Sequence, residues 1–261
     1  LDGAFALKQL VPEAAGLELG GIRDDMANSR LAAAAVAAAL KSPEGRARLA
    51  LAGVLGGIPG WTRRDRPEPA PGDIEAQVDE IGASFVMGVV LPRTDQEKRA
   101  GGIFSWNTGV DYARLLERSG RRKFVAALYR KAGLDLDQDL ARLNRAPRVA
   151  AHPPAVRYML DHYTPNARPR VPIVSLQTVG DGLTSPALQR AYTDAAPRRM
   201  ASGLWLREAG HCGMKAGQAL TALRYLEARL ERGRWPARPE GTVAHRPQPM
   251  LRPCFQRGRC R

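Results

Sequence analysis

Two short apolar segments constrain the fold of this chain most, because each is followed within a few residues by a polar residue beside glycine. Ile173–Thr178 (IVSLQT) is short, rich in strand-forming residues and preceded by a proline, so it predicts a buried strand. Ser202–Arg207 (SGLWLR) has the same character. The chain leaves the first segment at Asp181, which lies between two glycines, and leaves the second at His211, which follows a glycine. The pattern predicts two core strands whose ends release a carboxylate and an imidazole.

An acid after one strand and a Gly-His after the next, in that order, resembles the last third of an α/β-hydrolase. The resemblance is concentrated in residues 172–236, where Pro186–Tyr192 is similar to the helix after the acid loop and Gly217–Arg232 to the final helix. The phrases GRARLALA, GGIFSWNTGVDY and LYRKAGLDLDQDL in residues 1–170 resemble parts of a large insertion in actinobacterial members. The implied fold class is α/β: the last strands and helices of a hydrolase core with a large helical, lid-like insertion.

The resemblance assigns Asp181 as the orienting acid and His211 as the general base of a Ser-Asp-His triad. A serine hydroxyl needs an imidazole to take its proton, and a carboxylate on the other ring nitrogen holds the productive tautomer. Each residue also has a plain structural interpretation. Gly-Asp-Gly is ordinary turn chemistry, and a loop histidine is common on surfaces. The pairing and order of the two motifs favour the catalytic interpretation.

The nucleophile of such a triad is not found in the sequence. A nucleophile elbow requires Gly-x-Ser-x-Gly, but Ser84 has glycine on one side only and Ser175 lies inside the predicted strand. Cys212 follows the histidine and does not form an elbow either. The family order puts the serine before Leu1, so we expect the C-terminal portion of a longer hydrolase, or a processed or degenerate product, that is inactive alone.

The predicted organisation has three parts. Residues 1–165 form a helical lid or cap, with a helix start at Ser42 followed by Pro43, and further helices at 74–89 and beyond. Residues 166–236 form the C-terminal part of the hydrolase core, and residues 237–261 an irregular tail rich in proline and arginine. Because two parallel strands do not form a stable layer by themselves, the sheet requires neighbours.

The charge pattern argues against nucleic-acid binding. The net charge is +14, but the basic residues are mostly arginine interleaved with acids along helices, as on solvated helix faces. The locally basic stretches, Arg118–Lys123 and the tail from Arg246, lack the interleaved aromatic residues that stack on bases.

No cofactor or metal is predicted, because the four histidines are scattered and Asp135-x-Asp137-x-Asp139 fits acids at a helix start better than a calcium loop. Cys254 and Cys260 are close enough to bridge, or are incidental thiols. No apolar stretch is long enough for a membrane span. The localisation stays open; a secretory signal upstream of Leu1 would make the protein extracellular.

The expected function is therefore hydrolysis of a small-molecule or peptide ester or amide, with partners limited to that substrate and the missing N-terminal segment. The alternative is a noncatalytic helical interaction protein derived from a hydrolase that lost its nucleophile. Trp106 and Asn107 are candidates for the pocket wall, although a turn with a capping polar residue and a core tryptophan explains them better.

Overall fold

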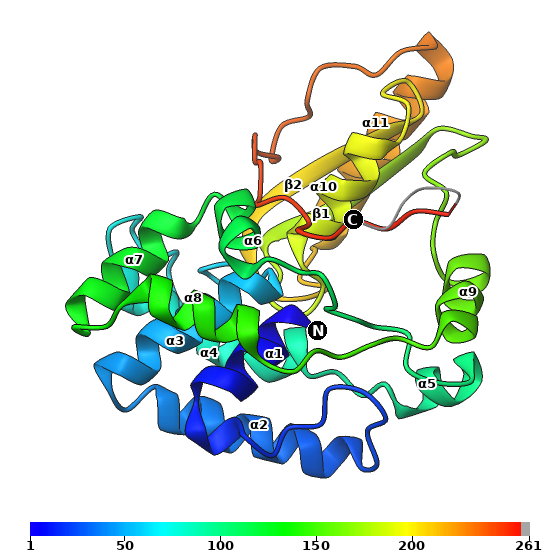
Figure 1. The fold of residues 1–261 in the computed structure, drawn as a ribbon. Coiled ribbons are helices and arrows are strands. Elements are labelled where there is room, and N and C mark those ends of the chain that lie inside the picture. Colours follow the sequence, from blue (N-terminus) through cyan, green and yellow to red (C-terminus); the bar gives the residue numbers. More distant parts are fainter. Residues whose placement is uncertain (257–261) are drawn as a thin grey trace.

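A computed structural model describes residues 1–256 of the chain. Helices account for every regular element up to residue 162, and the two strands follow (Figure 1). The first part contains α1 (Asp2–Leu10), a 3-10 turn (Pro12–Ala14), α2 (Asp25–Ala39), α3 (Pro43–Gly56), α4 (Ile74–Val89), α5 (Thr94–Ala100), α6 (Tyr112–Ser119), α7 (Arg122–Lys131), α8 (Leu136–Arg145) and α9 (Pro153–His162). The second contains β1 (Ile173–Gly180), α10 (Pro186–Ala195), β2 (Ala201–Ala209) and α11 (Ala216–Arg232).

The helical part is built around α3, which is apolar on most of its circumference. Its residues from Leu49 to Val54 are fully buried or nearly so, and α1, α4 and α7 pack against it. The predicted helix start is confirmed: the Ser42 hydroxyl accepts the N–H of Gly45, and Pro43 occupies the first turn. Gly57 ends the helix with a φ of 77°, in the left-handed region that favours glycine.

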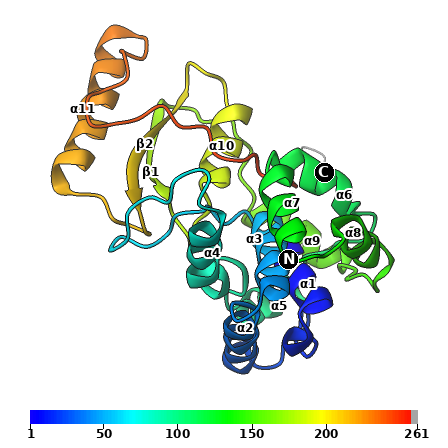
Figure 2. The ribbon, with the colours of Figure 1, turned by 90° about the vertical axis from the view of Figure 1, so that its left-hand side faces the viewer.

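The sheet consists of β1 and β2, which pair in parallel with Ile173 opposite Ala201. The parallel pair requires a crossover, which α10 provides, and Figure 2 shows the two strands between α10 and α11. One residue of the tail pairs with the outer edge of β2: the Val243 N–H donates to the Trp205 carbonyl at 2.9 Å. The fold is therefore mixed, about half helical, with a small parallel sheet.

The two strands fall out of register near their carboxyl ends. Thr178 is paired with Leu206, but Gly180 is paired with Ala209, so β2 contains one more residue than β1 over this interval. Such a bulge bends the strand and changes the face to which the following side chains point. It lies directly before the residues singled out by the sequence.

Two helices were not predicted from the sequence. The first, α5, is a single polar stretch of seven residues, and the second, α9, begins at two consecutive prolines. Neither has the long apolar periodicity on which a helix prediction depends. Between the end of α11 and residue 256 the tail forms no helix or strand apart from the bridge at Val243. In the described residues, no helix is long and apolar enough to cross a membrane.

Candidate functional site

Asp181 is the first residue after β1, and its side chain is almost completely buried, at 4% exposure. One carboxylate oxygen, Oδ1, accepts the backbone N–H groups of Leu183 at 2.9 Å and Thr184 at 2.8 Å. This is the turn geometry expected of an aspartate between glycines. The turn fixes the carboxylate through one oxygen and leaves the other oxygen, Oδ2, to face the end of β2.

His211 lies two residues beyond β2, and its ring nitrogen Nδ1 is 2.9 Å from Asp181 Oδ2. The hydrogen bond expected between the two residues is therefore present. A carboxylate accepts hydrogen bonds, so in the neutral form of the ring Nδ1 carries the proton and Nε2 has the free lone pair. The imidazole is partly exposed, with 40% of its side-chain area accessible. A buried carboxylate thus holds a partly exposed imidazole ring.

The ends of the two strands are also joined through their backbone. The Gly210 N–H donates to the Gly180 carbonyl at 2.9 Å, and the Thr178 hydroxyl donates to the Gly210 carbonyl at 2.8 Å. Gly210 has a φ of 87°, a conformation that L side chains rarely adopt. These contacts position the residue before His211 independently of the imidazole.

A loop from the helical part crosses the strand ends. The Arg64 guanidinium donates to the carbonyl of His211 and packs so closely on Gly210 that a side chain there would overlap it. The Trp61 carbonyl packs equally closely on Gly180, and the Thr62 side chain packs on Gly182. Residues 61–64, which we call the crossing loop, therefore connect the helical part to the backbone of both candidate residues.

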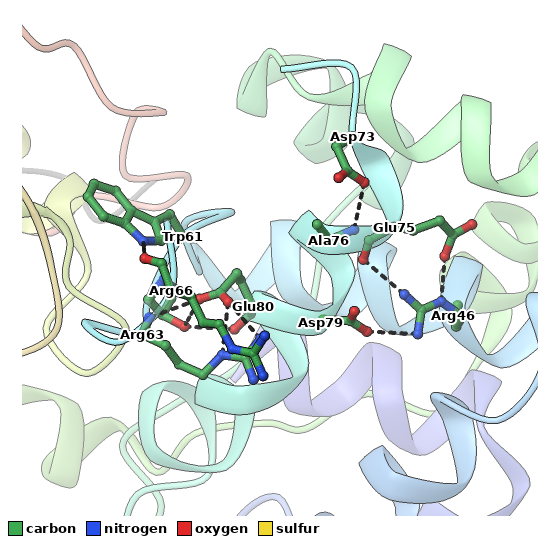
Figure 3. A network of polar contacts seen from close by, with 10 residues as sticks. Arg46, Trp61, Arg63, Arg66, Asp73, Glu75, Ala76, Asp79 and Glu80 are labelled. Atoms are coloured by element: carbon green, nitrogen blue, oxygen red, sulfur yellow. Dashed lines mark hydrogen bonds and ion pairs between the residues drawn. The ribbon is translucent and has the colours of Figure 1, made fainter. Parts of the chain in front are cut away.

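The crossing loop is anchored by a buried carboxylate on α4, as Figure 3 shows. Glu80 is only 2% exposed, and it accepts the N–H groups of Thr62 and Arg63 and the Arg63 Nε, each at 2.8 Å. Burial opposes ionisation of Glu80, but these hydrogen bonds outweigh it and lower the pKa of its carboxyl. Because the folded-state pKa is lowered, this stabilisation is complete above the unfolded-state pKa and is lost as the pH falls through the folded-state value.

We expect Glu80→Ala to lower the free energy of unfolding by about 3 kcal/mol, because it leaves buried donors of the crossing loop without an acceptor. Asp79→Ala is the matched control on the same helix. Asp79 is half exposed and shares Arg46 with Glu75, so we expect its loss to cost less than about 1 kcal/mol. Urea denaturation at neutral pH measures both. Equal losses in the two variants would contradict the anchoring role of Glu80.

The nucleophile candidates do not complete a triad. Ser84 lies in the middle of α4 with its hydroxyl packed on Gly182, and Ser175 lies within β1. Cys212 is an exposed free thiol with a φ of 52°. Throughout residues 1–256, no serine is hydrogen-bonded to the His211 ring, whose bonded partner is Asp181.

Two other residues singled out by the sequence, Asn107 and Asp135, have structural roles. Asn107 is completely buried, where its amide donates to the Tyr112 hydroxyl and its Oδ1 accepts the Val149 N–H. Asp135 caps the start of α8, as predicted for acids at a helix start. No group of three metal-ligating side chains occurs in the part of the chain that the structure describes. The pairing considered for Cys254 falls outside it, because Cys260 is not among the described residues.

The contact between the crossing loop and the candidate pair was not predicted from the sequence. The sequence of α4 does contain a sign of it, because Glu80, Ser84 and Gly88 are spaced four residues apart and so share one face of the helix. All three lie against the crossing loop or Gly182. A row of polar and small residues along one face of a helix indicates close packing against a polar segment.

Comparison with known proteins finds similarity to an amidase. The chain is 32% identical over 219 residues to a protein named o-phthalyl amidase from Xanthobacter agilis. The aligned region is 78% of this chain and 48% of that protein, so the chain spans about half the length of the relative. No protein-family model matches the sequence. No solved structure matches it either.

Proposed function

We propose that this chain provides the acid and the base of a serine hydrolase that cleaves amide bonds, and esters by the same chemistry. The observation that carries the proposal is the hydrogen bond of 2.9 Å between Asp181 and His211 at the ends of adjacent parallel strands. The similarity to a protein named as an amidase supports hydrolysis of an amide in general. In this proposal Asp181 is the orienting acid, and His211 is the general base.

The proposed chemistry follows from the state of the His211 ring. Nε2, with its lone pair free, takes the proton of a serine hydroxyl as the serine oxygen attacks the carbonyl carbon of the substrate. The protonated imidazole is stabilised by the Asp181 carboxylate, and it then returns the proton to the leaving amine or alcohol. In the second half of the cycle, Nε2 takes a proton from water as the water oxygen attacks the acyl-serine. The bond between the acyl group and the serine oxygen then breaks, the imidazolium returns the proton to that oxygen, and the acid is released.

The proposal includes a serine that lies outside this chain. It also includes membership of the α/β-hydrolase superfamily, in which residues 166–236 are the C-terminal part of the core and residues 1–165 the lid. The proposal assigns no catalytic role to the tail, residues 237–261. The remaining strands of the sheet and the oxyanion-hole amides would come from the same missing N-terminal segment as the serine. The substrate is a small-molecule or peptide amide or ester, and an o-phthalyl amide is the first compound to try.

We expect the 261-residue chain alone to be inert and the full-length gene product to be active. A serine-reactive fluorophosphonate should leave the mass of the chain unchanged, while it should add one phosphonyl group to the full-length protein. Mass spectrometry after incubation measures both, and turnover of an aryl amide measures activity alongside. Stoichiometric labelling of the isolated chain would contradict the location of the nucleophile, and Ser84 would be the first residue to test because it lies against Gly182.

The same experiment separates the proposal from the alternative of a noncatalytic interaction protein. A full-length protein that neither reacts with the phosphonate nor turns over an amide or ester would favour the alternative. The hydrogen bond between Asp181 and His211 would then be a structural contact that joins two strand ends.

A further inference from the structure

A second feature of the structure is a cavity beside the acid loop. It has a volume of about 320 Å³, within the range of small-molecule sites, and it lies between the segment 59–71, the start of α7 and tail residues 245–248. Val179 and Ser185, which precede and follow Asp181 in the chain, are part of its wall. Neither Asp181 nor His211 lines the cavity, so it is distinct from the candidate pair.

The wall contains one cation without a compensating charge, Arg121. Its Nη2 donates to Gln77 Oε1 at 2.9 Å, and the guanidinium lies over the Phe124 ring at 4.3 Å from its centroid. Within residues 1–256, no carboxylate pairs with it, although a guanidinium has five N–H donors. Burial lowers the pKa of Arg121, because removing the charge from water is costly and no anion offsets this cost.

The other titratable groups of the wall are already matched or neutral. Glu68 pairs with Arg207 at 2.8 Å, and Arg246 lies 3.9 Å from Asp194. Burial lowers the pKa of His245 from its ordinary value of 6.5, so this imidazole is uncharged at neutral pH. Among the described residues of the wall, Arg121 is thus the cation that has no carboxylate partner.

One part of the wall is apolar and flat. Trp61 donates a hydrogen bond of 2.9 Å from its Nε1 to the Arg66 carbonyl, which orients its ring (Figure 3). Pro59, Pro69 and Pro71 add rigid apolar surface. Rigid planar walls suit an aromatic ring, because stacking on them requires little ordering of side chains.

We propose that this cavity binds a small aromatic carboxylate, with the carboxylate on Arg121 and the ring against Trp61 and the prolines. A planar guanidinium binds a carboxylate through two parallel hydrogen bonds, a geometry that an ammonium group does not reproduce. The inference goes beyond the proposed function, since it concerns reversible binding and does not require His211 or a nucleophile.

The test is calorimetric titration of the chain with benzoate and with benzamide, its neutral isostere. We expect benzoate to bind with a dissociation constant of about 1 mM or lower, and benzamide to bind at least about tenfold more weakly. Arg121→Gln should weaken benzoate binding by about tenfold or more while leaving benzamide binding unchanged, and Arg121→Lys should give an intermediate loss. Lys123→Gln, an exposed cation two residues along on α7, is the matched control and should bind as the unaltered chain does.

Three results would overturn the proposal: no benzoate binding to the unaltered chain, equal binding of benzoate and benzamide, or unchanged benzoate affinity in Arg121→Gln. The comparison of the two ligands uses the unaltered chain, so it remains decisive even if Arg121→Gln does not fold. Because it measures no turnover, a failure here leaves the proposed hydrolase function untouched. An inactive full-length protein that still binds benzoate through Arg121 would overturn only the proposed function.

Discussion

In the longer hydrolase that we propose, His211→Ala should lower the turnover of an amide or ester by several orders of magnitude. In the proposed mechanism this change removes the group that takes the serine proton, and no other imidazole contacts Asp181 in the described residues to replace it. Folding should be nearly unaffected, because the imidazole is partly exposed and the backbone around it is held by the Gly210 and Arg64 contacts. Steady-state kinetics and the thermal midpoint, measured side by side, test this.

His162→Ala is the matched control for this experiment, since His162 is exposed at the end of α9. Its turnover should equal that of the unaltered protein. A His211→Ala variant with unaltered turnover would end the proposed mechanism. A variant that loses turnover together with a large drop in thermal midpoint would show instead that His211 is needed for the fold.

Asp181→Asn should lower the turnover rate by about 10⁴-fold, because it changes the tautomer of the histidine ring. The asparagine oxygen can keep the two backbone N–H groups that Asp181 Oδ1 accepts now. Its amide nitrogen then faces His211 Nδ1 as a donor, so the proton of the ring moves to Nε2, the atom that must accept the serine proton. The fold is retained while the base is blocked.

Asp161→Asn, at an exposed position on α9, serves as the control and should have no effect on turnover. The tautomer itself can be observed by nitrogen NMR of the imidazole, where Nδ1 should carry the proton in the unaltered protein and Nε2 in Asp181→Asn. Loss of turnover without a change of tautomer would assign Asp181 a role other than the one proposed.

The sequence predicted the sheet part well because its determinants are local. Each strand is a short apolar run bounded by glycine or proline, and the predicted 173–178 and 202–207 lie within the observed Ile173–Gly180 and Ala201–Ala209. Two parallel strands that are adjacent in the sheet place their carboxyl ends side by side, so the distance between Asp181 and His211 followed from the strand endings. Both interpretations of Asp181 proved compatible, since one oxygen makes the turn and the other holds the imidazole.

The crossing loop could not be predicted in this way. Glu80 and the backbone it binds at Thr62 are 18 residues apart, and Arg64 reaches His211 across 147 residues. In sequence, Glu80 resembles a solvated acid on a helix and Arg64 one of several arginines in a proline-rich loop. Only the packing of α4 against the strand ends gives these residues their partners. The same holds for Arg121, whose isolation from carboxylates is a property of the folded cavity.

The extra residue of β2 has a consequence for insertions and deletions. Between Leu206 and Ala209, β2 has Arg207 and Glu208, whereas β1 has Val179 alone between Thr178 and Gly180. Removing one of these two residues would restore the regular ladder and turn the chain that follows to the opposite face of the sheet. His211 would then point away from Asp181 although both residues were still present. The spacing between strand and histidine is thus as much a requirement of the pair as the identity of either side chain.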